Sequence, residues 1–270
     1  MSNKKLKSIS FSSIFFVIFF VIIITEVKSD EIKIDSYQPR YIVDMPSAGT
    51  LDNLQYSVDA MLVGNGGFLV DVTVGIFKIV NVSMSYGGTG VIGNAKMNLQ
   101  KYPGFHLKTK LLQEREVIPA IAIGFNSQGK GLYYEKQEKL SDDRYEQLAP
   151  DFYVAVSKSF NWAVGNLALS GGVNYSLLVP DDKGINIYAG VEQSILNVCA
   201  IAFEINPNLN DKNKYIWKDG KNPIMLNGAL KFTPLEDMII EVQFKDILKN
   251  ANHSTQIGRY FGVTFISKLF

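Results

Sequence analysis

The stretch QIGRYFGVTFISKLF, residues 256–270, decides the fold of this chain. It is rich in aromatic and β-branched residues, which pleated sheets favour. Phe261, Val263 and Phe265 share one side of an alternating pattern, as expected of a strand with two different faces. The stretch therefore predicts a β-strand, and we expect it to pair with the strand near residues 54–63 and so close a sheet.

The same period of two runs through most of the preceding chain. Tyr56, Val58, Ala60 and Leu62 alternate with more polar residues, and a helical period of about 3.6 does not fit these runs. The pattern gives an even number of predicted strands, and bacterial single-chain membrane barrels have an even number of strands. The twelve predicted strands lie at 54–63, 67–77, 79–88, 104–113, 117–126, 151–160, 165–178, 184–194, 196–206, 224–233, 237–246 and 256–268.

The predicted links between the strands also alternate in length. Short links follow the even-numbered strands, at 78, 114–116, 161–164, 195 and 234–236. Longer links follow the odd-numbered strands, at 89–103, 127–150, 179–183, 207–223 and 247–255, and the first hairpin at Asn65 breaks the trend. Outer-membrane barrels have short periplasmic turns and longer outside loops, whereas a soluble β-sandwich has no reason to alternate. The sequence predicts an all-β protein, a transmembrane antiparallel up-and-down β-barrel of about twelve strands.

One face of the predicted strands is apolar and the other is polar. In a barrel the apolar face meets outer-membrane lipid and the polar face lines the lumen; in a soluble β-sandwich the polar face would be the outer surface. The inward lysines suit a lumen that attracts anions, and a charge-paired, closed interior explains them equally well. The candidate lumen-lining residues are Asp59, Asp71, His106, Lys108, Lys110, Glu204, Lys231, Glu241 and Lys245.

The first residues differ from the rest of the 270-residue chain. Three lysines precede an uncharged apolar run at 13–25, and Ser29 supplies a small residue before a cut. This order predicts a secretory signal peptide at 1–29, and the run of about 13 residues is short for a membrane-spanning helix. We expect a plug or periplasmic segment at 30–53 and an outer-membrane barrel at 54–270. Phe270 is the expected signal for the barrel-assembly machinery.

The residue types of catalysis and metal binding are sparse. The net charge of +1 gives no indication of nucleic-acid binding,. Asn252, His253 and Ser254 are the types of a hydrolase triad, but adjacent residues cannot all face one another. Isolated His106 and His253 and the single Cys199 give no metal-ligand spacing,. The sequence predicts no catalytic residue, no cofactor and no metal.

Three segments indicate a family. PAIAIGFNSQGKG at 119–131, FYVAVSK at 152–158 and GNLALSGGVNYSL at 165–177 resemble the barrel repeat of YjbH-like outer-membrane proteins, and MPSAGTL at 45–51 is similar to the family's N-terminal entry. The resemblance implies a barrel fold, an outer-membrane location and an association with exopolysaccharide export. Family members are usually longer and look like two barrels in one chain, and the resemblance carries over no catalytic residue.

The sequence leaves three functional hypotheses open, and the first two apply to a barrel of this kind. The first is a narrow pore or envelope component, linked to the export of polysaccharide or small solutes. The second is a structural barrel with a closed lumen, in which the outside loops 127–150 and 207–223 do the binding. The third reading is a secreted soluble β-sandwich.

Overall fold

The computed structural model describes residues 39–94, 96–136, 143–162, 164–178, 184–195, 198–211, 213–218, 223–252 and 256–269. All of them belong to one compact unit, Ser36–Phe270. The predicted signal peptide at 1–29, the loop residue His253 and the predicted assembly signal Phe270 lie outside the described residues.

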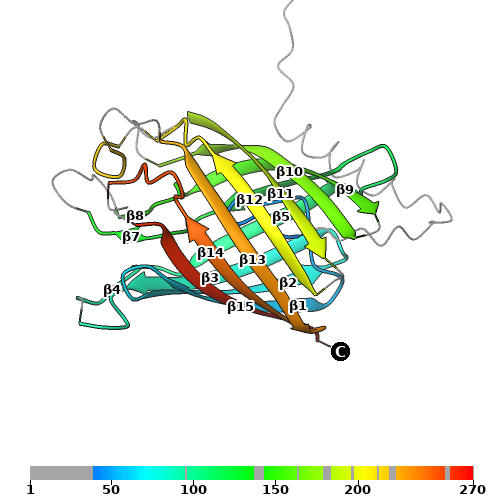
Figure 1. Cartoon of the computed structure of the whole chain (residues 1–270), viewed down its shortest axis with the longest axis horizontal. Helices are drawn as coiled ribbons and strands as arrows, with labels where there is room; N and C mark the ends of the chain where they lie inside the picture. The colour runs from blue at the N-terminus through cyan, green and yellow to red at the C-terminus, as the bar shows by residue number, and fades with distance from the viewer. Residues whose placement is uncertain are drawn as a thin grey trace, which may run out of the picture. The chain divides into compact units, whose positions relative to one another are not determined.

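Within these ranges, twelve antiparallel strands form a closed barrel (Figure 1). β1 pairs with β2 on one side and with β15 on the other, so each of the twelve strands has two neighbours. The barrel strands are β1 (Gln55–Val63), β2 (Gly67–Ile76), β3 (Val80–Thr89), β5 (Gly104–Leu112), β6 (Ala120–Asn126), β9 (Asp151–Trp162), β10 (Gly165–Ser176), β11 (Gly184–Ile195), β12 (Cys199–Asn206), β13 (Met225–Leu235), β14 (Met238–Lys245) and β15 (Gly258–Lys268). The short strand β4 (Asn98–Leu99) extends β3, and β7 (Tyr133–Tyr134) pairs with β8 (Arg144–Tyr145).

The predicted barrel is confirmed, and each predicted strand overlaps an observed one. The third reading, a β-sandwich, is wrong because β15 pairs with β1 from Gln55↔Lys268 to Leu62↔Phe261. This pairing has a continuous register through Tyr56↔Ser267. The closing strand is therefore regular up to Lys268.

The wall alternates between an apolar outer face and a small or polar inner face. In β12, Ile201, Phe203 and Ile205 are exposed, whereas Ala202 and Glu204 are buried. An apolar outside with a polar, closed interior is the arrangement of a barrel that crosses a membrane with strands, because closure satisfies the backbone groups of every strand. Among the described residues, no helix has the length and apolar character to cross a membrane.

The two ends of the barrel differ. At one end the strands are joined by the links 77–79, 113–119, 163–164, 196–198 and 236–237. At the other end the links are 64–66, 90–103, 127–150, 177–183, 207–224 and 246–257. We call these the short-turn end and the long-loop end.

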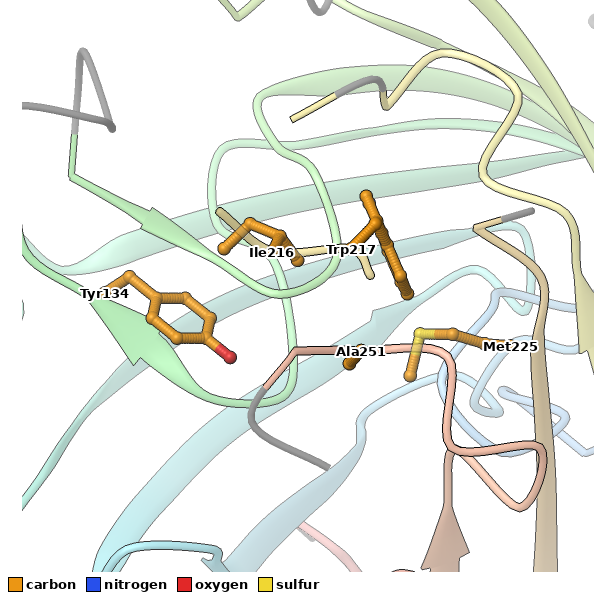
Figure 2. Close-up of a cluster of buried hydrophobic side chains, with 5 residues drawn as sticks. All are labelled: Tyr134, Ile216, Trp217, Met225 and Ala251. Carbon is orange, nitrogen blue, oxygen red and sulfur yellow. The ribbon is translucent and has the colours of Figure 1, made fainter. Parts of the chain in front are cut away.

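A compact group of residues covers the long-loop end, and we call it the lid. It consists of the described residues of the loops 127–150 and 207–224, together with Ala251. Tyr134, Ile216 and Trp217 pack with Met225 and Ala251 in a buried cluster (Figure 2).

A buried ion pair joins the two loops of the lid. Arg144 Nη2 lies 2.7 Å from Asp211 Oδ2, and Nη1 lies 3.2 Å from Oδ1. The two side chains are 1% and 0% exposed. Because a bidentate pair of this kind fixes both distance and orientation, the two loops form one unit.

Candidate functional site

The N-terminal segment 39–51 lies inside the barrel, and we call it the plug. It folds back on itself: Ile42 N–H donates to Met45 O at 2.9 Å, and Ser47 N–H donates to Arg40 O at 3.1 Å. Ile42 is 1% and Met45 0% exposed. The plug is thus a tight hairpin whose tip, residues 42–45, is surrounded by the wall and the lid.

Glu204 of β12 holds the tip of the plug. Its Oε2 accepts three backbone N–H groups, from Val43 at 3.0 Å, Asp44 at 2.9 Å and Met45 at 2.7 Å. Its Oε1 accepts from Asn227 Nδ2 at 3.0 Å. A buried carboxylate with four donors is well satisfied, and the hairpin tip would leave three N–H groups unpaired without it.

Two inward lysines hold plug carbonyl groups. Lys108 Nζ donates to Arg40 O at 2.7 Å and to Gly49 O at 3.2 Å. Lys231 Nζ donates to Ile42 O at 3.1 Å. These lysines therefore bind the plug, a contact that the sequence did not indicate when it left an anion-attracting lumen and a charge-paired, closed interior open for them.

Two ion pairs lie beside the tip of the plug. Lys245 Nζ lies 2.5 Å from Asp44 Oδ1, with the two side chains 3% and 8% exposed. Lys231 Nζ lies 2.6 Å from Glu192 Oε2. These four charges beside the plug are thus paired within the barrel, which offsets part of the cost of burying them.

Small side chains of the wall make room for the plug. Val43 packs with Ala202 and Ala229, and Ala48 packs with Ala120 and Ala122. These alanines alternate with large apolar residues that face outward. The wall is therefore thin where the plug lies.

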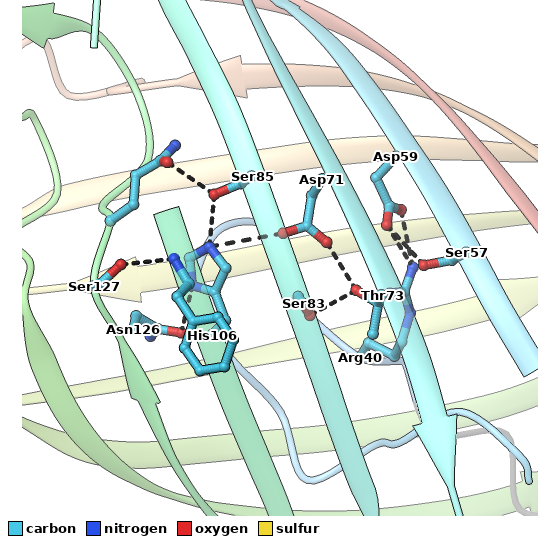
Figure 3. Close-up of polar contacts among 12 residues, drawn as sticks. Arg40, Ser57, Asp59, Asp71, Thr73, Ser83, Ser85, His106, Asn126 and Ser127 are labelled. Carbon is cyan, nitrogen blue, oxygen red and sulfur yellow. Dashed lines mark hydrogen bonds and ion pairs between the residues drawn. The ribbon is translucent and has the colours of Figure 1, made fainter. Parts of the chain in front are cut away.

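Arg40 connects the plug to the opposite side of the wall (Figure 3). Its Nη2 lies 2.9 Å from Asp59 Oδ1 of β1. Asp59 also accepts from Ser57 Oγ at 2.9 Å and from Thr264 Oγ1 at 2.6 Å.

His106 forms a polar network with β2, β3 and β6 (Figure 3). Its Nε2 lies 2.8 Å from Ser85 Oγ and 3.7 Å from Asp71 Oδ2, and its Nδ1 lies 3.2 Å from Asn126 Oδ1. Ser85 Oγ donates to Gln128 Oε1 at 2.8 Å. The network thus connects polar side chains of β2, β3, β5 and β6 on the inner face of the wall.

A cavity of about 400 Å³ lies beside the plug. One side is formed by inward residues of β1, β2, β14 and β15, including Asp59, Asp71 and Glu241, and the plug forms the other. At the short-turn end the cavity reaches the exposed Glu236 and Asp237, which join β13 to β14. At the long-loop end it reaches buried residues of the lid, such as Gly131 and Leu148. The cavity opens toward the short turns and is covered by the lid.

The remaining predicted residues lie in different places. Glu241 lines the cavity and accepts from Gln243 Nε2 at 2.9 Å. Lys110 is half-buried on β5 and is not among the residues that line the cavity. Some of the predicted residues thus hold the plug and others face the cavity, whereas Lys110 is in neither group.

The described residues contain no group of three or more His, Cys, Asp or Glu side chains that could hold a metal ion. Cys199 is exposed at the start of β12.

The sequence left a plug and a periplasmic segment open as alternatives for 30–53, and it indicated no partner for Glu204. Pro46 and Gly49 make a continuous strand unlikely there, but they do not tell where such a segment lies. The isolated bridge between Tyr41 and Pro46 is local, and a turn of this kind has no periodic signature.

The comparisons with known proteins give structures of similar fold. No protein-family model matches the chain, and no curated protein matches it. A NanC porin structure has a TM-score of 0.46 at 10% identity, covering 80% of this chain and 100% of that one. A KdgM porin has a TM-score of 0.44 at 12% identity, covering 78% of this chain and 98% of that one. At these scores the chain is assigned to neither family, and the YjbH-like resemblance stays a prediction.

Proposed function

We propose that this chain is a non-enzymatic outer-membrane β-barrel whose lumen is a narrow pore for small solutes, closed at rest by the plug and the lid. The apolar outer face of the twelve strands supports contact with outer-membrane lipid,. The predicted signal peptide supports export, and barrel-assembly machinery is the partner that inserts proteins of this kind.

The observation that carries the proposal is the cavity beside the plug. It extends from the exposed turn at Glu236 to the underside of the lid, next to the plug for its whole length. A volume of about 400 Å³ corresponds to roughly a dozen water molecules in the liquid. This room suits ions and small solutes, and a polysaccharide chain would pass only after the plug had left.

The barrier to passage is the lid, so its buried ion pair gives the test. Arg144→Met leaves Asp211 buried without its partner, which costs about 3 kcal/mol or more and loosens the two loops. We expect rare, small channel events in planar bilayers from the wild-type chain and more frequent events from this variant. Lys96→Met removes a positive charge from an exposed side chain at the same end and is the matched control.

Heat-modifiable gel migration must first show that each preparation is folded. Folded wild-type protein and folded Arg144→Met protein that both give no channel events would refute the pore.

A second candidate is a structural barrel with a permanently closed lumen that binds through its loops. The observation that favours it is the lid itself, because Tyr134, Ile216 and Trp217 are buried as in a protein core. In that case the polysaccharide association implied by the YjbH-like resemblance would belong to the loops. Binding of an acidic exopolysaccharide to the reconstituted barrel, lost when 207–224 is replaced by a short turn, would support this candidate.

A further inference from the structure

The basic groups inside the barrel are already engaged. Lys108 binds plug carbonyl groups, Lys245 is paired with Asp44, and Arg40 is paired with Asp59. Neither Lys108 nor Lys245 lines the cavity of about 400 Å³. Arg40, Lys130 and Lys231 do line it. Lys231 is paired with Glu192 and donates to Ile42 O, and Lys130 lies over the ring of Tyr41 at 3.3 Å from the ring centroid.

The acidic groups of the cavity are arranged differently. Glu236, Asp237 and Glu241 follow one another along the β13–β14 hairpin, from the mouth of the cavity inward. Among the described residues, no lysine or arginine nitrogen is found within 4.0 Å of these three carboxylates. Within the described part of the chain, the entrance is therefore lined by carboxylates that form no ion pair, because Lys231, the cross-strand neighbour of Glu241, is paired with Glu192.

Gln243 adds an acceptor atom to this path. The side chain is 1% exposed and lines the cavity. Its Nε2 donates to the carboxylate of Glu241, which fixes the orientation of the amide. Its Oε1 then has no hydrogen-bond partner within the described part of the chain, so a buried acceptor awaits a donor.

We propose that the pore takes small cations, and among them organic ammonium ions that carry N–H donors. This inference rests on the proposed function, because it names the solute class of the same cavity. Fixed charges inside a low-dielectric wall act over longer distances than charges in water, so uncompensated carboxylates at the mouth concentrate cations and exclude anions. An ammonium group also supplies the donor that Gln243 Oε1 lacks, which a potassium ion cannot do.

Two measurements test the inference, and only the first requires conduction. The first is the reversal potential in a tenfold KCl gradient, with the lid variant Arg144→Met as the background. We expect K⁺ to be preferred over Cl⁻, and Glu241→Gln to lower the permeability ratio by about twofold or more. Glu116→Gln removes one carboxylate from an exposed position outside the cavity lining and is expected to leave the ratio unchanged.

The second measurement is the temperature at which the folded barrel loses its heat-modifiable gel band. We expect ethylammonium chloride to raise this temperature above the value in KCl at equal ionic strength. Glu241→Gln is expected to remove the difference, and Glu116→Gln to keep it.

The outcomes separate the two proposals. A preference for Cl⁻, or a ratio that Glu241→Gln does not change, would overturn the cation inference while the pore stands. Absence of channel events with stabilisation by ethylammonium that depends on Glu241 would refute the pore and support the cation site. Absence of both would overturn both.

Discussion

The two sides of the lumen differ in what faces inward. β6 and β11–β13 present small residues and Glu204, and the plug packs against them. β1 and β14 present Asp59, Glu241 and Gln243, and a cavity remains between them and the plug. Small wall residues thus allow a second layer of chain to pack inside the barrel, whereas the polar side chains of β1 and β14 leave a gap beside it. The same barrel therefore contains both a packed plug and a cavity.

The largest expected effect comes from removing the carboxylate that holds the plug. Glu204→Ala leaves three buried N–H groups of the plug without an acceptor, at about 1–3 kcal/mol for each group. We expect the plug to leave the wall, so that trypsin cleaves after Arg40 in detergent-solubilised protein and the conductance rises. Both sides of the lumen would then be open.

Glu116→Ala is the control for this variant, because it removes a carboxylate that is exposed at the short-turn end. Equal resistance of Glu204→Ala and Glu116→Ala to trypsin would show that the plug is held by the lysines and by packing alone.

A smaller effect on stability is expected when a methyl group is added to a glycine that faces the lumen. One such substitution on each side of the lumen compares the two sides directly. A Cβ atom at Gly190 of β11 would lie 2.4 Å from Phe203 O of the wall and 2.5 Å from Ile42 Cγ2 of the plug, whereas one at Gly262 of β15 would lie 3.2 Å from the flexible end of Met61. Gly190→Ala is expected to cost about 1–3 kcal/mol by overpacking. Gly262→Ala is expected to cost less than about 1 kcal/mol.

The measurement is the urea concentration at which each variant loses its folded gel band. A larger loss for Gly262→Ala than for Gly190→Ala would contradict the assignment of the packed and the open side.

The smallest effect concerns the lid that covers the cavity. Burial, reinforced by the carboxylates of Asp246 and Asp44, raises the pKa of Glu146 to about 7 from its ordinary value of 4.5. The closed lid thus favours the protonated carboxyl group, so lid stability is highest below about pH 4.5 and falls as the pH rises through 7. Hydrogen exchange of the β7 and β8 amides, corrected for the intrinsic rate, should show faster opening at pH 8 than at pH 5.

Glu146→Gln should remove this pH dependence, because the amide does not titrate. Glu135→Gln, an exposed change in the same loop, should preserve it. A pH dependence that persists in Glu146→Gln would assign it to another group.

The barrel could be predicted from local features of the sequence. A strand with one apolar face has a period of two, and the alternating lengths of the links distinguish the two ends of a barrel. The regular register of β15 through Lys268 was not evident from the sequence, because Phe261, Val263 and Phe265 share one side of the alternation whereas Phe270 falls on the other. The short strands β4, β7 and β8 are too short to have a periodic signal.

The contacts of the plug could not be predicted in the same way. Glu204 and the backbone groups it binds are separated by about 160 positions in the chain, and a backbone N–H carries no residue type that would reveal its partner. The alternation placed Lys108 and Lys231 on the polar face, but the carbonyl groups they bind come from a segment without a periodic pattern. Charge alone therefore left an anion-attracting lumen and a charge-paired, closed interior equally open, and the contacts place these lysines at the plug.

The hairpin form of the plug has a consequence for biogenesis. Its two arms run side by side, since Ser47 N–H binds Arg40 O, so the tip can enter a closed barrel as a loop without threading a chain end through it. The partners of the tip lie on β11–β14, which are synthesised long after residues 39–51. Residues 42–45 therefore cannot complete these contacts until β14 has been synthesised, although they precede every strand of the barrel in the chain.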